Sequence, residues 1–201
     1  MNLKIRDFRI CDIGSFVRML GREWNLGKRV AGAGKLCDWI YAFEILRLAS
    51  EIFVLVDDSG RRIGFGGYNQ KGNPRRRFWR TIYRAVYDMS FLCVKNRAEL
   101  RRYYDTYDYA PDDVKKLFDA EVTILIVDKE LRGQKSGRLL FDEIVRRAAK
   151  SGVKSLRIDT DDSCGVGFYI HAGCREIYKS KTGKDGERLC AENVYVFGRN
   201  L

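Results

Sequence analysis

The feature that most constrains the fold is an apolar run that leads through a short loop into a helix. The run EVTILIVD, residues 121–128, has the length and composition of a buried strand. The loop KELRGQ follows, and KSGRLLFDEIVRRAAKSG, residues 135–152, carries apolar side chains at helical spacing. A strand, a loop and a helix in this order favour an α/β fold.

Further strands and helices are predicted on both sides of this unit. Residues 3–10 alternate apolar and polar side chains, as in a half-buried strand, and two helices are predicted next, the first beginning after Asp12 as N-cap. Residues 51–70 predict a hairpin that turns at 57–60. After 152, the pattern predicts a strand, a short helix ending at Gly173, and two strands joined across 182–186. We therefore expect one domain over residues 1–201, with a twisted mixed sheet flanked by helices.

The composition is that of an ordinary globular chain. Its 201 residues are 45% hydrophobic and 32% charged, which is enough apolar material for one sizeable core. No run approaches the roughly 18 apolar residues that span a bilayer, and the N-terminus lacks a signal-peptide apolar block. We expect a cytoplasmic protein without a membrane contact. Six cysteines without a C-x-x-C pair and one histidine favour no metal site.

The net charge of +11 is concentrated in one segment. Residues 71–104 hold ten lysines and arginines against two acids, and a predicted helix at 75–87 has an apolar stripe flanked by arginines. Three interpretations remain open for this helix: a docked helix with solvated arginines, an anion-binding surface for RNA or membrane, or a lid over a substrate. Residues 71–119 are predicted to form a helical insert between the third and fourth strands.

The loop at 132–138, RGQKSGR, has the composition of an anion site. Gly133 and Gly137 let a ligand approach the backbone, while Arg132, Lys135 and Arg138 add positive charge before a helix N-terminus. It matches neither the G-x-G-x-x-G of dinucleotide sites nor the G-x-x-x-x-G-K-[ST] of nucleoside-triphosphate loops. On its own the pattern also fits a solvated surface loop.

In its surroundings this loop resembles the acetyl-CoA motif of the GCN5-related N-acetyltransferase (GNAT) superfamily. That motif has the usual form V-x-P-E-x-R-G-x-G-x-G-x-x-L, and residues 127–140 here are VDKELRGQKSGRLL. Arg132 and Gly137 match its first and last conserved positions. The departure is Lys135, which stands where the middle glycine is usual.

A second matching segment follows about 30 residues later. Phe168, Tyr169 and Gly173 fit the aromatic-Tyr-x-x-x-Gly pattern of the family, with Cys174 where phenylalanine is typical. Asp162 occupies a position where the family often has an Asn or Asp that contacts the pantetheine arm. The resemblance covers most of the chain except residues 71–119.

The resemblance implies direct transfer of an acetyl group from acetyl-CoA to a primary amine in a ternary complex. Glu121 would be the general base and Tyr169 the general acid, although the same residues also fit a strand-end carboxylate facing water and a packed aromatic. A backbone N–H of Ile126 or Val127 would polarise the thioester carbonyl. The cofactor site would comprise the strand end beside the pantetheine and the loop beneath the pyrophosphate: Leu125, Ile126, Val127, Arg132, Gly133, Gln134, Lys135, Ser136, Gly137, Arg138 and Asp162.

The acceptor is not named by any pattern in the sequence. In the stretch YYDTYDYAPDD, Tyr104, Asp105 and Asp108 offer an aromatic wall and negative charge for a cationic amine. The competing hypothesis is a non-catalytic module that binds acyl-CoA, or RNA through the basic helix. The sequence leaves the oligomeric state open, including a homo-oligomer.

Overall fold

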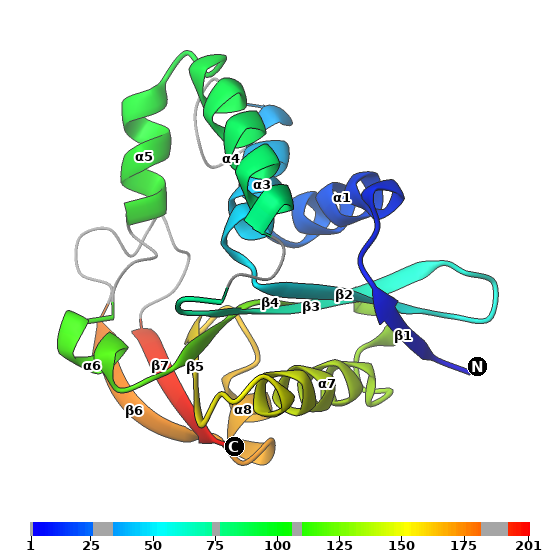
Figure 1. Cartoon of the computed structure of the whole chain (residues 1–201), viewed down its shortest axis with the longest axis vertical. Helices are drawn as coiled ribbons and strands as arrows, with labels where there is room; N and C mark the ends of the chain where they lie inside the picture. Colours follow the sequence, from blue (N-terminus) through cyan, green and yellow to red (C-terminus); the bar gives the residue numbers. More distant parts are fainter. Residues whose placement is uncertain (1, 26–33, 74–76, 106–109, 182–192) are drawn as a thin grey trace.

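A seven-stranded sheet organises the computed structural model (Figure 1), which describes residues 2–25, 34–73, 77–105, 110–181 and 193–201. The strands lie in the order β1-β2-β3-β4-β5-β7-β6, and only β4 and β5 run parallel to each other. Their bounds are β1 Lys4–Asp7, β2 Glu51–Val56, β3 Arg62–Gln70, β4 Ala120–Val127, β5 Ser155–Asp161, β6 Arg175–Lys181 and β7 Asn193–Asn200.

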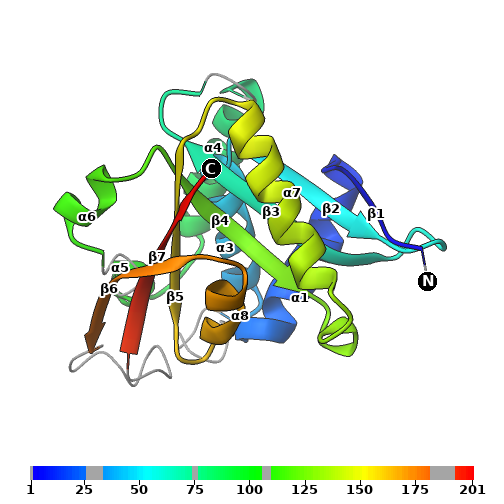
Figure 2. The same cartoon turned by 90° about the horizontal axis from the view of Figure 1, so that it is seen from below.

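Helices cover both faces of the sheet (Figures 1 and 2). Helices α1, α3 and α4 lie on one face of the half formed by β1 to β4, and α7 lies on the other. The helices are α1 Ile13–Trp24, α3 Leu36–Leu48, α4 Arg77–Leu92, α5 Arg97–Asp105, α6 Asp112–Lys116, α7 Ser136–Lys150 and α8 Val166–His171, with 3₁₀ turns η1 Ile10–Asp12 and η2 Lys129–Leu131. Three of them, α4, α5 and α6, fall between β3 and β4.

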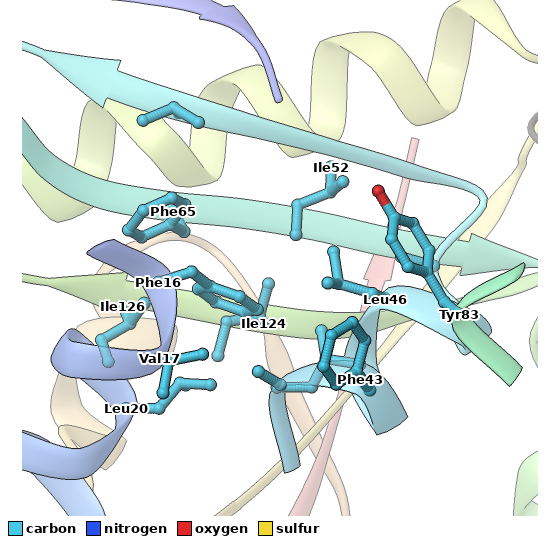
Figure 3. Packing of buried hydrophobic residues seen from close by; sticks show 14 of the residues in the cluster. Phe16, Val17, Leu20, Phe43, Leu46, Ile52, Phe65, Tyr83, Ile124 and Ile126 are labelled. Atoms are coloured by element: carbon cyan, nitrogen blue, oxygen red, sulfur yellow. The ribbon is translucent and has the colours of Figure 1, made fainter. Parts of the chain in front are cut away.

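One apolar core fills the space between the sheet and α1 and α3 (Figure 3). Phe16 and Leu20 of α1 and Leu46 of α3 are fully buried against β3 and β4. Tyr83 of α4 belongs to the same cluster, so the segment between β3 and β4 is attached to this core. Each such buried side chain contributes about 1.5–3 kcal/mol, which holds these helices to the sheet.

The core on the opposite face is built by α7 against strands β2 to β5. Leu140, Ile144 and Ala148, at helical spacing, are fully buried there. Helix α7 lies so close to β3 that position 64 requires glycine. A Cβ added at Gly64 would lie 2.8 Å from Cδ1 of Leu140 and 2.9 Å from the carbonyl oxygen of Ile126. This contact fixes α7, and therefore the loop before it, relative to β4.

The predicted fold class is confirmed, as is the order of strands and helices. Two local expectations, for β1 and for α4, differ. The first strand is shorter than predicted, and Ile10 at its expected end is exposed. On α4, Tyr83 docks but Phe78, at the start of the predicted stripe, is 70% exposed. The link across 182–186 lies outside the described residues.

Asp12 does not cap α1 with its side chain as predicted. Its fully buried carboxylate accepts hydrogen bonds from Arg6 (2.7 Å from each of two nitrogens), Arg62 Nε (2.9 Å) and the Arg9 backbone N–H (2.8 Å). Asp12 therefore links β1, β3 and the turn before α1. Among the described helices, the structure contains none with the length and apolar composition needed to cross a membrane.

Candidate active site

Strands β4 and β5 separate into a wedge (Figure 2). In the described residues they pair only at Ala120 with Leu156 and at Glu121 with Arg157. Beyond this point β5 stays paired with β7 along its whole length, while β4 stays paired with β3. The second half of β4 therefore has one edge without a neighbouring strand.

The strand register shows which backbone groups of β4 face the wedge. The N–H of Asp128 donates to the carbonyl of Ile63, its partner in the antiparallel ladder (2.8 Å). Hydrogen-bonded pairs alternate along such a ladder, so Ile126 directs its N–H toward β3 and the N–H groups of Leu125 and Val127 point toward β5. Of the two predicted donors, the register therefore favours Val127 over Ile126, and it adds Leu125.

A cleft of about 480 Å³ lies in the wedge. It is bounded by β4, the loop before α7, α8 with the turn before it, and the end of α1. Nine residues predicted from the sequence line it: Leu125, Ile126, Val127, Arg132, Gly133, Lys135, Gly137, Arg138 and Tyr169. The structure thus brings the two matching motifs to one cavity, although they lie about 30 residues apart in the chain.

The loop at the mouth of the cleft presents unpaired amides. Gly133 (φ 79°) and Lys135 (φ 63°) both adopt left-handed backbone conformations, which turn the chain into α7. Within the described residues, the N–H groups of Ser136, Gly137 and Arg138 have no acceptor, as is usual in a first helical turn. The Oγ of Ser136 is buried and also lacks a described partner. These donors and the positive end of the helix dipole are suited to binding an anion.

The three cations of the loop are not equivalent. Arg132 pairs with Glu23 of α1 at 2.6 Å, and Arg138 pairs with Asp142 at 2.8 Å and donates to the carbonyl of His171. No acidic side chain among the described residues pairs with Lys135. The lysine that replaces the usual glycine is thus the cation left available for a ligand.

Tyr169 lies on α8 and forms one wall of the cleft. Its ring packs edge-on against Phe141 and Phe168 and stacks with Phe197 at 5.9 Å between centroids. Burial raises the pKa of its phenol well above the ordinary value, with smaller contributions from Cys164 and Cys174. The phenol therefore stays protonated at neutral pH and can donate a proton or a hydrogen bond.

Glu121 lies at the closed end of the wedge, outside the residues that line the cleft. It is four residues before Leu125, or about 13 Å along the strand. Its carboxylate pairs with Arg157 of β5 and accepts a hydrogen bond from Asn69 of β3 (3.2 Å). The side chain is 33% exposed. The structure therefore shows a charge-compensated carboxylate that water can reach.

Three other predicted cofactor residues do not line the cleft: Gln134, Ser136 and Asp162. The first two still belong to the loop, where backbone N–H groups are the relevant donors. The carboxylate of Asp162 instead accepts hydrogen bonds from Tyr195 (2.7 Å) and from the backbone and side chain of Asn193, and these bonds lower its pKa. In the structure, Asp162 therefore joins the end of β5 to β7.

Several cleft residues were missed by sequence analysis: Glu23, Trp24, Ser163, Cys164, Gly165 and Phe168 as a wall of the cleft. Glu23 and Trp24 end a helix about 100 residues before the loop, and no motif connects the two. The turn 163–165 could have been found, because it directly precedes the Phe-Tyr segment. For the predicted acceptor residues, the backbone of Tyr104 and Asp105 lies in the last turn of α5; their side chains and the whole of Asp108 lie outside the described residues.

These features define a mixed α/β domain whose sheet opens between two parallel strands above a helix N-terminus. Family models and curated proteins were searched, and neither gives a match. Solved structures do: a mosquito arylalkylamine N-acetyltransferase like 5b is 17% identical, with both chains covered in full and a TM-score of 0.59.

Two more solved structures have the same arrangement. A polyamine N-acetyltransferase from Drosophila melanogaster is 15% identical, with both chains covered in full and a TM-score of 0.58. A GNAT-family acetyltransferase from Staphylococcus aureus is 13% identical over the whole of this chain and 99% of its own, with a TM-score of 0.57. The chain has the GNAT fold, and the resemblance seen in its sequence is confirmed at the level of the fold.

Proposed function

We propose that this protein is an N-acetyltransferase that transfers an acetyl group from acetyl-CoA to a primary amine. The observation that carries the proposal is the meeting, in one cleft, of the free edge of β4, the unpaired amides of α7 and the partly buried Tyr169. Each of these three features is suited to a different part of an acyl-CoA. The fold neighbours that are named N-acetyltransferases support the same assignment.

The residues of the cleft fit acetyl-CoA. The amides of Ser136, Gly137 and Arg138, with Lys135, would hold the pyrophosphate. The backbone groups of Leu125 and Val127 would pair with the amides of the pantetheine arm, in the manner of an added strand. Bound in this way, acetyl-CoA would supply an activated acetyl group as a thioester.

The chain's own groups then account for the chemistry of transfer. The N–H of Leu125 or Val127 would donate to the thioester oxygen and stabilise the negative charge that develops there. Glu121 would accept the proton that the acceptor ammonium must lose before its nitrogen attacks, directly or through water. The carbon–sulfur bond breaks as the new amide forms, and the Tyr169 phenol would donate to the leaving sulfur. Transfer is direct, without an acyl-enzyme.

The assignment of acid and base is tested by two variants measured for CoA release and acetyl-CoA affinity. Tyr169→Phe keeps the ring packing and removes the phenol, so kcat should fall about 10²-fold or more with acetyl-CoA affinity unchanged. Glu121→Gln should lower kcat similarly. Wild-type kcat in either variant would remove that residue from the mechanism. A protein that binds acetyl-CoA but releases no CoA with any amine would be the non-catalytic module.

For the acceptor we propose a small molecule with a primary amine. The segment between β3 and β4 is proposed to form the acceptor side, and Tyr104, Asp105 and Asp108 stay a prediction within it. The variants Asp105→Asn and Asp108→Asn should raise the KM for the acceptor and leave acetyl-CoA binding unchanged. An unchanged KM in both would place the acceptor elsewhere.

A further inference from the structure

A second cavity, of about 510 Å³, lies between the start of α4 and the end of β3. Five of its lining residues are cationic: Arg47, Lys71, Arg77, Arg80 and Arg84. Among the described residues that line it, none is an aspartate or glutamate. We call this cavity the cationic groove. It is separate from the cleft between β4 and β5, with which it shares no lining residue.

Three of the five cations are held by contacts within the protein, and one of them is Lys71, whose Nζ donates to the backbone carbonyl of Lys115 (3.3 Å). The guanidinium of Arg47 makes two hydrogen bonds of 2.6 Å with Glu44 and lies 4.7 Å from the ring centroid of Tyr87. Arg80 donates from Nε to the backbone carbonyl of Arg47 (2.9 Å). These contacts form the wall of the groove.

The others leave positive charge available to a ligand. Arg77 is exposed and has no acidic partner among the described residues, while the side chain of Arg84 is 73% exposed and lies 4.0 Å from Asp88. With Arg80, these residues recur at i, i+3 and i+7, so three like charges share one face of α4. Such an arrangement of like charges is destabilising in the absence of an anion. A bound anion would reverse that cost.

The groove is connected to the proposed base. Asn69 lines the groove, and its Nδ2 donates to Oε1 of Glu121 (3.2 Å). Glu121 in turn pairs with Arg157 at the closed end of the wedge. Asn69 therefore contacts both the groove and the carboxylate that would deprotonate the acceptor.

We propose that the acceptor is a primary amine that carries a phosphate group, with the phosphate in the cationic groove and the amine beside Glu121. Several arginines converging without a carboxylate suit a dianionic phosphate, which guanidinium groups bind through paired hydrogen bonds. A carboxylate on the groove surface would be needed to favour a polyamine tail, and the described lining has none. This inference rests on the proposed acetyl transfer and specifies its substrate class.

The first test compares ω-aminoalkyl phosphates with aminoalkanols of the same chain length, two to six carbons, as acceptors. For at least one length the phosphate should lower KM about tenfold or more. Arg77→Glu combined with Arg84→Glu should abolish this difference and leave acetyl-CoA affinity unchanged. The matched control is Arg175→Glu, an exposed arginine on β6 outside both cavities, which should keep the preference.

The second test is binding of pyrophosphate by calorimetry, with CoA at saturation so that the loop before α7 is occupied. The wild type and Arg175→Glu should bind, and the double variant should bind at least tenfold more weakly. Equal KM values for phosphates and alcohols, or pyrophosphate binding that survives in the double variant, would overturn the inference. The inference would also be overturned if the groove bound RNA in a salt-dependent manner while the protein showed no preference for phosphorylated over unphosphorylated acceptors. If the inference fails but amines without a phosphate are acetylated, the proposed acetyl transfer still stands. If the protein does not bind acetyl-CoA, both the proposed acetyl transfer and the inference about its acceptor fail.

Discussion

Lys135 occupies a backbone conformation that ordinarily selects glycine. With φ at 63° it adopts the left-handed conformation, which costs an L-residue roughly 1–2 kcal/mol. The side chain reaches no described acid, so no ion pair offsets this strain. A strained residue at the entrance to a cleft is the kind of feature that is kept for a function. At Lys135 that function would be an additional phosphate contact.

Comparing the stabilities of Lys135→Gly and Lys135→Ala separates the cost of the backbone conformation at position 135 from the loss of the lysine charge. Lys135→Gly should raise the free energy of unfolding by about 1 kcal/mol, because glycine adopts this φ without a Cβ clash. Lys135→Ala removes the same charge and keeps the strain, so it should not be stabilised. The measurement is denaturant unfolding of the three proteins. Equal stability of the glycine and alanine variants would show that the backbone at 135 is not strained.

At the site, the sequence predicted residues that belong to a local motif and missed those that tertiary structure supplies. Arg132 and Gly137 could be predicted because the loop and the start of its helix are encoded over a few adjacent residues, and Tyr169 was predicted through the resemblance to the family motif. Trp24 could not be found, since only the packing of α1 on the sheet brings it to the cleft. Asp162 has the expected residue type, but hydrogen bonds to Asn193 and Tyr195 orient its carboxylate toward β7.

Among the elements, β1 is held at the edge of the sheet by a buried ion-pair network. Burial alone would raise the pKa of Asp12, but hydrogen bonds from Arg6 and Arg62, with the N–H of Arg9, outweigh it and lower the pKa to about 2. The pKa of Asp12 is lower in the folded protein than its ordinary value of 3.8. The ionised carboxylate therefore stabilises the folded state fully at pH values above about 3.8. That contribution is lost as the pH falls from about 4 toward 2.

Asp12→Asn tests this network. The variant leaves two arginines beside a buried neutral side chain, so it should lose about 3 kcal/mol of unfolding free energy at pH 7. The difference from the wild type should shrink as the pH approaches 2, where the native carboxylate is itself protonated. Glu176→Gln, on the exposed surface of β6, is the control and should change stability by less than about 0.5 kcal/mol. A pH-independent difference for Asp12→Asn would contradict the assignment.

For the whole molecule, the strand and helix order was predictable because hydrophobic periodicity is a local signal. The pairing of β5 with β7 and the wedge beside β4 could not be derived from that local signal, since strand pairing joins residues far apart in the chain. The segment between β3 and β4 showed the limit of such prediction. Its helices are amphipathic in sequence, yet only the structure shows that Tyr83 anchors α4 and that Phe78 does not.

The proposals of acetyl transfer and of a phosphorylated acceptor assign two binding regions to the molecule, and the segment between β3 and β4 lines the second of them. The cleft at the free edge of β4 is suited to acetyl-CoA, and the cationic groove beneath α4 is suited to an anionic acceptor. Glu121 lies where β4 and β5 are still paired, in contact with Asn69 of the groove. The arrangement allows both substrates to be bound at once, as direct transfer requires.

The most direct test of the central claim, that the cleft binds acetyl-CoA, is a thermal-shift titration of the wild type and Gly137→Glu. A Cβ at 137 meets only Phe168, at 3.7 Å, so the variant should fold, while its carboxylate would lie at the amides proposed to hold the pyrophosphate. At about 100 times its Kd, acetyl-CoA should stabilise the wild type by about 2.7 kcal/mol, which raises Tm by roughly 5–10 °C. The variant should not respond. An unchanged wild-type Tm at millimolar acetyl-CoA, or an equal shift in both proteins, would contradict the claim.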